Sequence, residues 1–192
     1  MVRRVLLLGL STLLFTAACA RTAPPPATEP RSTTGSTSLN ASTEAHIFIA
    51  VLHRYLTTPG DNSFPDTRFP VVYVLDHTDA RAADPMRTIA PPDGAPISLT
   101  DQHRIIAALG DVATIRFVGA RSDVIVRDNG RDRVRDGGIL ILLAPPVGGP
   151  DHVQVGINGF IACLGATWLT YVVQRGTDGW TVTGTTGTVA IS

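Results

Sequence analysis

The stretch ATWLTYVVQRGTDGWTVTGTTGTVAIS, residues 166–192, decides the fold. Side chains 168, 170, 172 and 174 share one face of an extended chain, and side chains 169, 171, 173 and 175 share the other. Gly176-Thr177-Asp178-Gly179 follows as a tight-turn sequence, so the stretch predicts a long β-hairpin. Neither face is fully polar, which indicates helices over one face and partial cover of the other.

Further strands precede this hairpin. GILILLAPP (138–146) and HVQVGINGF (152–160) extend it into a four-strand meander. VVYVLD (71–76), VATIRFVG (112–119) and DVIV (123–126) are short and rich in β-branched residues, as buried strands are.

Two segments have helical spacing. STEAHIFIAVLHRYLTT (42–58) places its large apolar side chains on one face and ends at Pro59-Gly60. SLTDQHRIIAALGD (98–111) begins with a Ser98 cap and reaches Gly110 at its end. Its expected buried stripe is Leu99, Ile105, Ile106 and Leu109. The chain therefore predicts an α+β domain, with two helices packed on one face of a largely antiparallel, curved sheet that ends in a four-strand meander.

This order of elements resembles the nuclear-transport-factor-2-like (ketosteroid-isomerase-like) domains and the cystatin-like domains, which end in long curved strands. The segment YVVQRGTDGWTVTG, residues 171–184, is similar to the final hairpin of many uncharacterised exported actinobacterial proteins. The resemblance implies that a catalytic site, where such a domain has one, lies in the cone of the sheet.

The N-terminus has the pattern of an export signal. Met1-Val2-Arg3-Arg4 is basic, and residues 5–18 are uncharged and mostly apolar. That run is shorter than the roughly 20 residues that a membrane-spanning helix needs. Cleavage before Arg21 would fit an ordinary signal peptidase. Thr16-Ala17-Ala18-Cys19 resembles the lipobox of bacterial lipoproteins, in which the cut precedes the cysteine and its thiol carries a diacylglycerol.

The segment after Cys19 favours the lipoprotein interpretation. Residues 21–43 are dominated by Pro, Thr, Ser and Ala, which form extended, solvated linkers. Such a spacer suits a domain tethered to a membrane. We expect a signal peptide (1–18), a lipidated Cys19 with a tether (19–43), and one domain (44–192) on the outer face of the cell membrane. Free secretion is the alternative.

The amino-acid composition limits the classes of molecule that the chain is expected to bind. The chain has 192 residues, no lysine and a formal net charge of zero. Removal of Arg3 and Arg4 with the signal leaves 14 arginines against 16 acidic residues, a net charge of −2. This excludes the basic surplus that nucleic-acid binding needs. The bias towards Arg, Ala, Gly and Asp is typical of GC-rich bacteria such as actinobacteria.

Asp76 and His77 are the candidate catalytic residues, in a segment that also holds Asp79 and Asp84. A histidine beside a carboxylate at a strand end suits acid–base or metal chemistry. However, neighbours on a strand point to opposite faces, so the two converge only if the strand has already ended. The spacing matches no metal-ligand motif, and we expect neither a metal nor a cofactor.

The remaining candidates have simpler structural interpretations. Cys163 lies among apolar residues and is expected to be a small buried side chain; a nucleophile or an intermolecular disulfide is the alternative. His53, His103 and His152 are expected at the surface. The charged segment 127–138 is expected to be a solvated hairpin tip, with docking to an envelope partner as the alternative.

The function expected from the sequence is that of a non-catalytic binding domain at the cell envelope. Its partners would be the membrane, through the lipid anchor, and an envelope protein, a wall component or a small ligand. One alternative is a small enzyme with a pocket in the cone that uses Asp76 or His77. Another is a modulator of an envelope receptor or protease.

Overall fold

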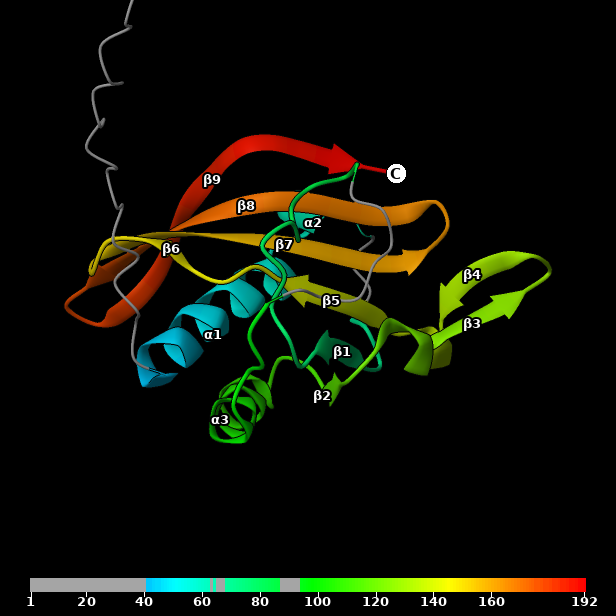
Figure 1. The fold of residues 1–192 in the computed structure, drawn as a ribbon, viewed down its shortest axis with the longest axis horizontal. Coiled ribbons are helices and arrows are strands. Elements are labelled where there is room, and N and C mark those ends of the chain that lie inside the picture. Colours follow the sequence, from blue (N-terminus) through cyan, green and yellow to red (C-terminus); the bar gives the residue numbers. More distant parts are fainter. Residues whose placement is uncertain (1–40, 63, 65–67, 87–93) are drawn as a thin grey trace, which may run out of the picture. The chain divides into compact units, whose positions relative to one another are not determined.

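The computed structural model describes residues 41–62, 64, 68–86 and 94–192. Three α-helices are α1 (Ala41–Thr57), the short α2 (Pro59–Asn62) and α3 (Leu99–Leu109), and two 3₁₀ turns are η1 (Arg121–Asp123) and η2 (Arg135–Gly137). The strands are β1 (Val72–Leu75), β2 (Ile115–Val118), β3 (Ile125–Asp128), β4 (Arg131–Val134), β5 (Ile139–Leu143), β6 (Val147–Gly148), β7 (His152–Ala162), β8 (Gly165–Gly176) and β9 (Gly179–Ile191). Figure 1 labels them along the chain.

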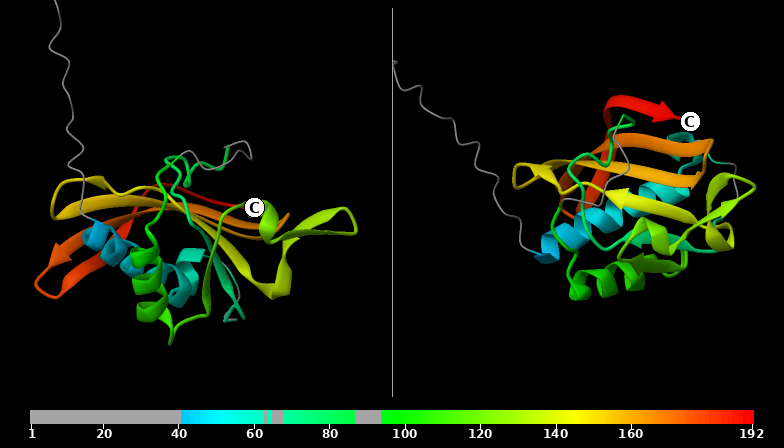
Figure 2. Two further views of the ribbon diagram at one scale, coloured as in Figure 1. Left: turned by 60° about the horizontal axis from the view of Figure 1, so that its bottom comes forward. Right: turned by 45° about the vertical axis from the view of Figure 1, so that its right-hand side comes forward.

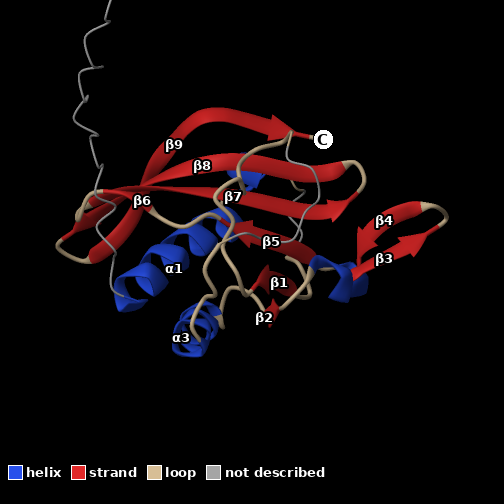
Figure 3. Cartoon of the chain, viewed as in Figure 1, coloured by secondary structure: helices blue, strands red, loops and turns tan. Residues whose placement is uncertain are grey.

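These strands form one open, mixed and largely antiparallel sheet, which confirms the α+β class (Figures 1 and 3). Strands β5, β7, β8 and β9 pair antiparallel in that order. The other end of the sheet differs from a purely antiparallel arrangement, since β2, β1 and β5 pair parallel. Parallel neighbours require crossover connections, and α3 supplies the one from β1 to β2.

The main core lies between α1, α3 and the sheet. Phe48, Leu52 and Tyr55 of α1 are fully buried, as the helical spacing predicts. Helix α1 contacts α3, β8 and β9, and α3 also contacts β2 (Figure 2). A second, smaller core on Val71, Tyr73 and Leu75 includes residues of β4 and β5. The second side of the sheet is thus covered around β1, β4 and β5.

The expected N-cap of α3 is confirmed, but half of the expected buried stripe of this helix is wrong. The Ser98 hydroxyl accepts from the amide of Asp101, as a helix N-cap does. Ile105 and Leu109 are buried, whereas Leu99 and Ile106 are 71% and 38% exposed. The buried residues of α3 recur every four positions along one side of the helix. Leu99 and Ile106 lie outside that line.

Candidate functional site

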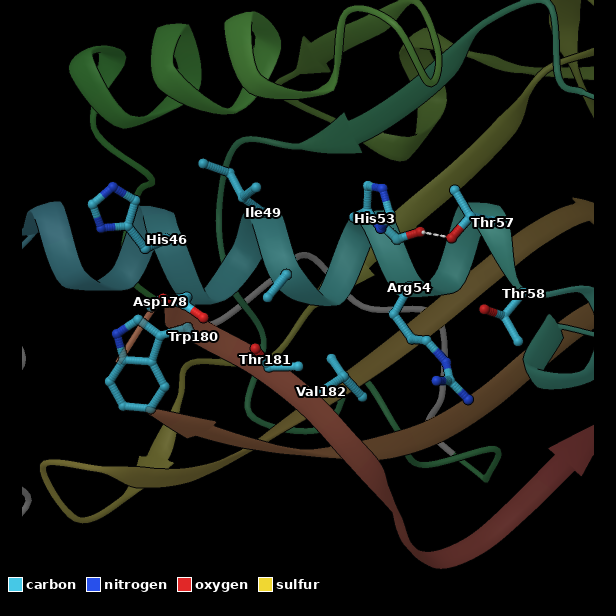
Figure 4. Close-up of a pocket in the computed structure, with 12 residues that line it drawn as sticks. His46, Ile49, His53, Arg54, Thr57, Thr58, Asp178, Trp180, Thr181 and Val182 are labelled. Carbon is cyan, nitrogen blue, oxygen red and sulfur yellow. Dashed lines mark hydrogen bonds between the residues drawn. The ribbon is translucent and has the colours of Figure 1, made fainter. Parts of the chain in front are cut away.

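A groove of about 710 Å³ runs between α1 and the start of β9 (Figure 4). Helix α1 contributes one wall with His46, Ile49, Ala50, His53, Arg54 and Thr57, followed by Thr58. Residues 178–182, at the turn into β9, contribute the other wall. The volume lies in the range of small-molecule sites, roughly 300–1,000 Å³.

The helical period explains the first wall. Positions 46, 49, 50, 53, 54 and 57 recur every three or four residues, so they form one stripe along α1. The stripe lies beside the buried face of Phe48, Leu52 and Tyr55. Its apolar members, Ile49 and Ala50, are partly buried and pack against the main core. A rigid, well-anchored helix therefore holds this side of the groove.

A bulge in β9 positions the second wall. Val172 of β8 pairs with Gly184 and the next residue, Val173, pairs with Val182, so Thr183 is an extra residue. A bulge increases the local twist and bends its strand. The first part of β9 thereby lies against α1, with Trp180 and Val182 packed on the main core. Figure 4 shows Trp180, Asp178 and His46 at one end of the groove and Arg54, Thr57 and Thr58 at the other.

Arg54 is held by a hydrogen-bonded network. Its Nε donates to Asp61 Oδ2 at 2.7 Å, and its Nη2 donates to Asp61 Oδ1 at 3.4 Å. The buried hydroxyl of Tyr171 donates to the same Asp61 carboxylate at 3.1 Å. The hydrogen bond to Asp61 raises the pKa of Arg54. Burial and then the Asp61 charge raise the pKa of Tyr171. The network fixes the guanidinium at the end of the groove.

Asp76 and His77 converge, because the strand has already ended before them, which is the condition that the alternation argument set. His77 Nδ1 lies 2.5 Å from Asp76 Oδ1. The contact forms because β1 ends at Leu75 and the chain bends at Asp76, which stops the alternation of a strand. Both side chains are partly open to solvent, with 39% of His77 and 31% of Asp76 exposed.

The backbone around this pair is well fixed. The amide of Asp76 donates to Val118 of β2, and the amide of Asp79 donates to Leu143 of β5. The returning segment 94–97 closes the third side, where the amide of Ile97 donates to the Asp76 carbonyl at 2.7 Å. The pair therefore lies at the carboxyl ends of the parallel strands, where open α/β sheets bind ligands.

The other acidic candidates do not join the pair in a metal site. Asp79 is buried and its carboxylate accepts from the amide of Arg81, while Asp84 accepts from the amide of Met86. Across the part of the chain that the structure describes, no group of three or more His, Cys, Asp and Glu is placed to hold a metal ion.

Cys163 is exposed, so its expected burial is wrong. The residue lies in the turn between β7 and β8, after the apolar strand has ended. Its Sγ accepts from the amide of Asp132 at 3.1 Å, and its own amide donates to the Asp132 carbonyl. The apolar neighbours that suggested burial belong to the strand ends and to Leu164, which is itself exposed.

The surface expectations are confirmed. His53, His103 and His152 are exposed, although His53 also lines the groove. The segment 127–138 contains the β3–β4 hairpin, with Asn129 and Gly130 in the left-handed region at its tip. Arg127 pairs with Asp132 at 3.3 Å and Arg133 pairs with Asp128 at 3.4 Å, so opposite charges meet across the hairpin.

The comparisons with known proteins add no assignment. No protein-family model, no curated protein and no solved structure matches the chain. Among the described residues, no helix is long and apolar enough to cross a membrane. The expected signal peptide, Cys19 and nearly all of the tether lie outside the described residues; α1 begins at Ala41, within the segment expected to be tether.

Proposed function

We propose that the chain is an exported bacterial lipoprotein whose domain binds a small ligand in the groove between α1 and β9 without converting it. In this proposal Cys19 carries the lipid, residues 21–43 form the tether, and two helices cover one face of a sheet that ends in a four-strand meander. The nuclear-transport-factor-2-like and cystatin-like domains remain the structural analogy, but the ligand site lies in the groove and not in the cone of the sheet.

The groove is the observation that carries the binding function. Four apolar side chains, Ile49, Ala50, Trp180 and Val182, line it and pack on the core, while polar side chains surround them. Ligand sites typically combine an apolar lining with a few polar groups that fix orientation. Both walls belong to regular elements, so little ordering is required when a ligand binds.

Binding in the groove can be tested with the neutral apolar dye N-phenylnaphthylamine, whose fluorescence rises in apolar surroundings. Ala50→Phe fills the groove from α1 and Val182→Phe narrows it from β9, because the Val182 side chain lies on the face of β9 that packs on the core under α1. Both variants should lose the dye. Ala107→Phe, on the exposed side of α3, is the matched control and should bind normally. Dye binding that is equal in all four proteins would contradict the proposal.

The anchor has its own test. The intact mass of the mature protein from native membranes should show a chain that begins at Cys19 and carries a diacylglycerol increment. Cys19→Ala should abolish the increment and release the protein from the membrane fraction. A soluble wild-type chain that begins at Arg21 would make free secretion correct instead.

A second function, hydrolysis, is favoured by the contact between Asp76 and His77. A carboxylate on Nδ1 orients an imidazole so that Nε2 can take a proton from water. Turnover of nitrophenyl acetate should fall in His77→Gln and in Asp76→Asn. His103→Gln and His152→Gln remove exposed histidines elsewhere and should leave the rate unchanged. Equal rates in all variants would remove the support for an enzyme.

A further inference from the structure

We infer that the ligand of the α1–β9 groove is a short neutral oligosaccharide. The inference rests on the proposed binding function and names the chemical class of its ligand. Four features of the groove support it: the charge balance, the mixture of hydrogen-bonding groups, the aromatic surface of Trp180 and the length of the groove.

The charge balance excludes a strongly ionic ligand. Arg54 and Asp178 carry opposite charges, and the imidazoles of His46 and His53 are exposed to solvent. An anion would have to compete with Asp61, which already binds the Arg54 guanidinium at 2.7 Å. A cation would find a single carboxylate on an exposed turn, where the attraction is screened by salt.

The polar groups of the groove are a mixture of donors and acceptors. The guanidinium of Arg54 donates, the carboxylate of Asp178 accepts, the Thr58 hydroxyl can do both, and the Thr57 hydroxyl, which donates to the His53 carbonyl at 2.7 Å, can still accept. A ligand must match each of these groups, because a polar group that loses water without gaining a new partner weakens binding. Sugar hydroxyls satisfy such a mixture, since every hydroxyl both donates and accepts.

Trp180 supplies the apolar part of the recognition. The side chain is partly buried against the core and lies at the end of the groove with His46 and Asp178 (Figure 4). An indole offers a broad flat surface, and the C–H face of a pyranose ring matches it in shape. Carboxylate and imidazole groups beside the ring can then bind the hydroxyls at its rim.

The length of the groove indicates several sugar rings in a row. His46 and Thr57 are eleven positions apart in α1, which corresponds to about 16 Å along the helix axis. An elongated groove of about 710 Å³, bounded by a helix and a strand, suits a di- or trisaccharide better than one compact ring.

The sequence allows a direct spectroscopic test, because the chain has two tryptophans. Trp168→Phe removes the one on β8, which is outside the groove lining, and leaves Trp180 as the reporter. Chitotriose, cellotriose and maltotriose are the probes. At least one should change the Trp180 fluorescence saturably, and raising the NaCl concentration should leave its affinity unchanged.

Isothermal titration calorimetry on the wild type and on groove variants locates the bound sugar. Trp180→Ala should weaken binding about three- to tenfold, the range expected for one aromatic contact. Val182→Phe should abolish binding, while Trp168→Phe should bind like the wild type. An affinity that is unchanged in Trp180→Ala and in Val182→Phe, or that falls steeply with salt, would overturn the inference.

The same proteins separate the two levels of the proposal. If no sugar binds but N-phenylnaphthylamine binds and is lost in Val182→Phe, the oligosaccharide inference is wrong and the binding groove stands. If neither the sugars nor the dye bind, the groove is not a ligand site and both proposals are wrong.

Discussion

The hydroxyl of Tyr55 on α1 meets the hydroxyl of Thr167 on β8 inside the main core, 112 positions apart in the sequence. Gly159 of β7 makes this contact possible, because a methyl group at that position would occupy the space of the Tyr55 hydroxyl. Burial raises the pKa of Tyr55, so the phenol stays protonated and available to the threonine. This contact ties the helix that forms one wall of the groove to the long strands that carry the other.

Gly159→Ala should therefore destabilise the domain. Insertion of a methyl group into a packed core costs about 1–3 kcal/mol, and here the obstacle is a side chain held in a buried hydrogen bond. Urea unfolding followed by circular dichroism gives the free energy of unfolding. Gly184→Ala is the matched control, since nothing lies within 4 Å of the added methyl group there. Tyr55→Phe should recover part of the loss in the double variant, and no recovery would show that the clash lies elsewhere.

Asp61→Ala should cost about 1–3 kcal/mol, because it leaves the buried Tyr171 hydroxyl without its acceptor and Arg54 without its anion. Asp151→Ala removes an exposed partner of Arg175 at 3.9 Å and should cost less than about 1 kcal/mol. Urea midpoints of the two variants measure the difference. Equal midpoints would mean that the Asp61 network contributes no more than a surface ion pair.

The sequence predicts the local part of this fold well. The final hairpin, the buried face of α1 and the Ser98 cap depend on periods and spacings within a few residues, and these are confirmed. The parallel pairing of β1 with β2 and β5 depends instead on which distant strands meet, and no period of the sequence reports that. The predicted burial of Cys163 is wrong because apolar neighbours in the sequence do not imply burial when the residue lies in a turn.

The sequence indicates each wall of the groove separately but not that the two walls meet. The stripe of His46, His53 and Thr57 at helical spacing is visible in the sequence as a polar face of α1. Trp180 is visible as an aromatic residue just after a hairpin turn. The bulge at Thr183, which brings the two halves together, has no clear sequence signal, and so the groove was missed. Convergence of Asp76 and His77 likewise required the position at which β1 ends.

Cys163 should react with a thiol reagent in the native protein, because its side chain is exposed. The experiment uses Cys19→Ala, in which Cys163 is the one remaining cysteine. Labelling with iodoacetamide, read by intact mass, should proceed without denaturant, and Cys163→Ser should remove the label while keeping the urea midpoint unchanged. A thiol that reacts only after unfolding would restore the interpretation of a buried side chain.

Glu44 should make the stability of the domain depend on pH. This half-buried carboxyl lies in the first turn of α1, where burial and then the charge of Asp101 raise its pKa above 4.5. The folded chain therefore holds the proton to a higher pH than the unfolded chain. Its contribution to stability is present below pH 4.5 and is lost as the pH rises through the folded pKa.

Glu44→Gln removes the ionisation, so the variant should gain stability over the wild type at neutral pH and match it in acid. Urea midpoints at both pH values measure this, with the exposed Asp111→Asn as a control that should change little. A Gln variant that is less stable at neutral pH would mean that attraction to the positive end of α1, about 0.3–1 kcal/mol for such charges, outweighs the cost of burial.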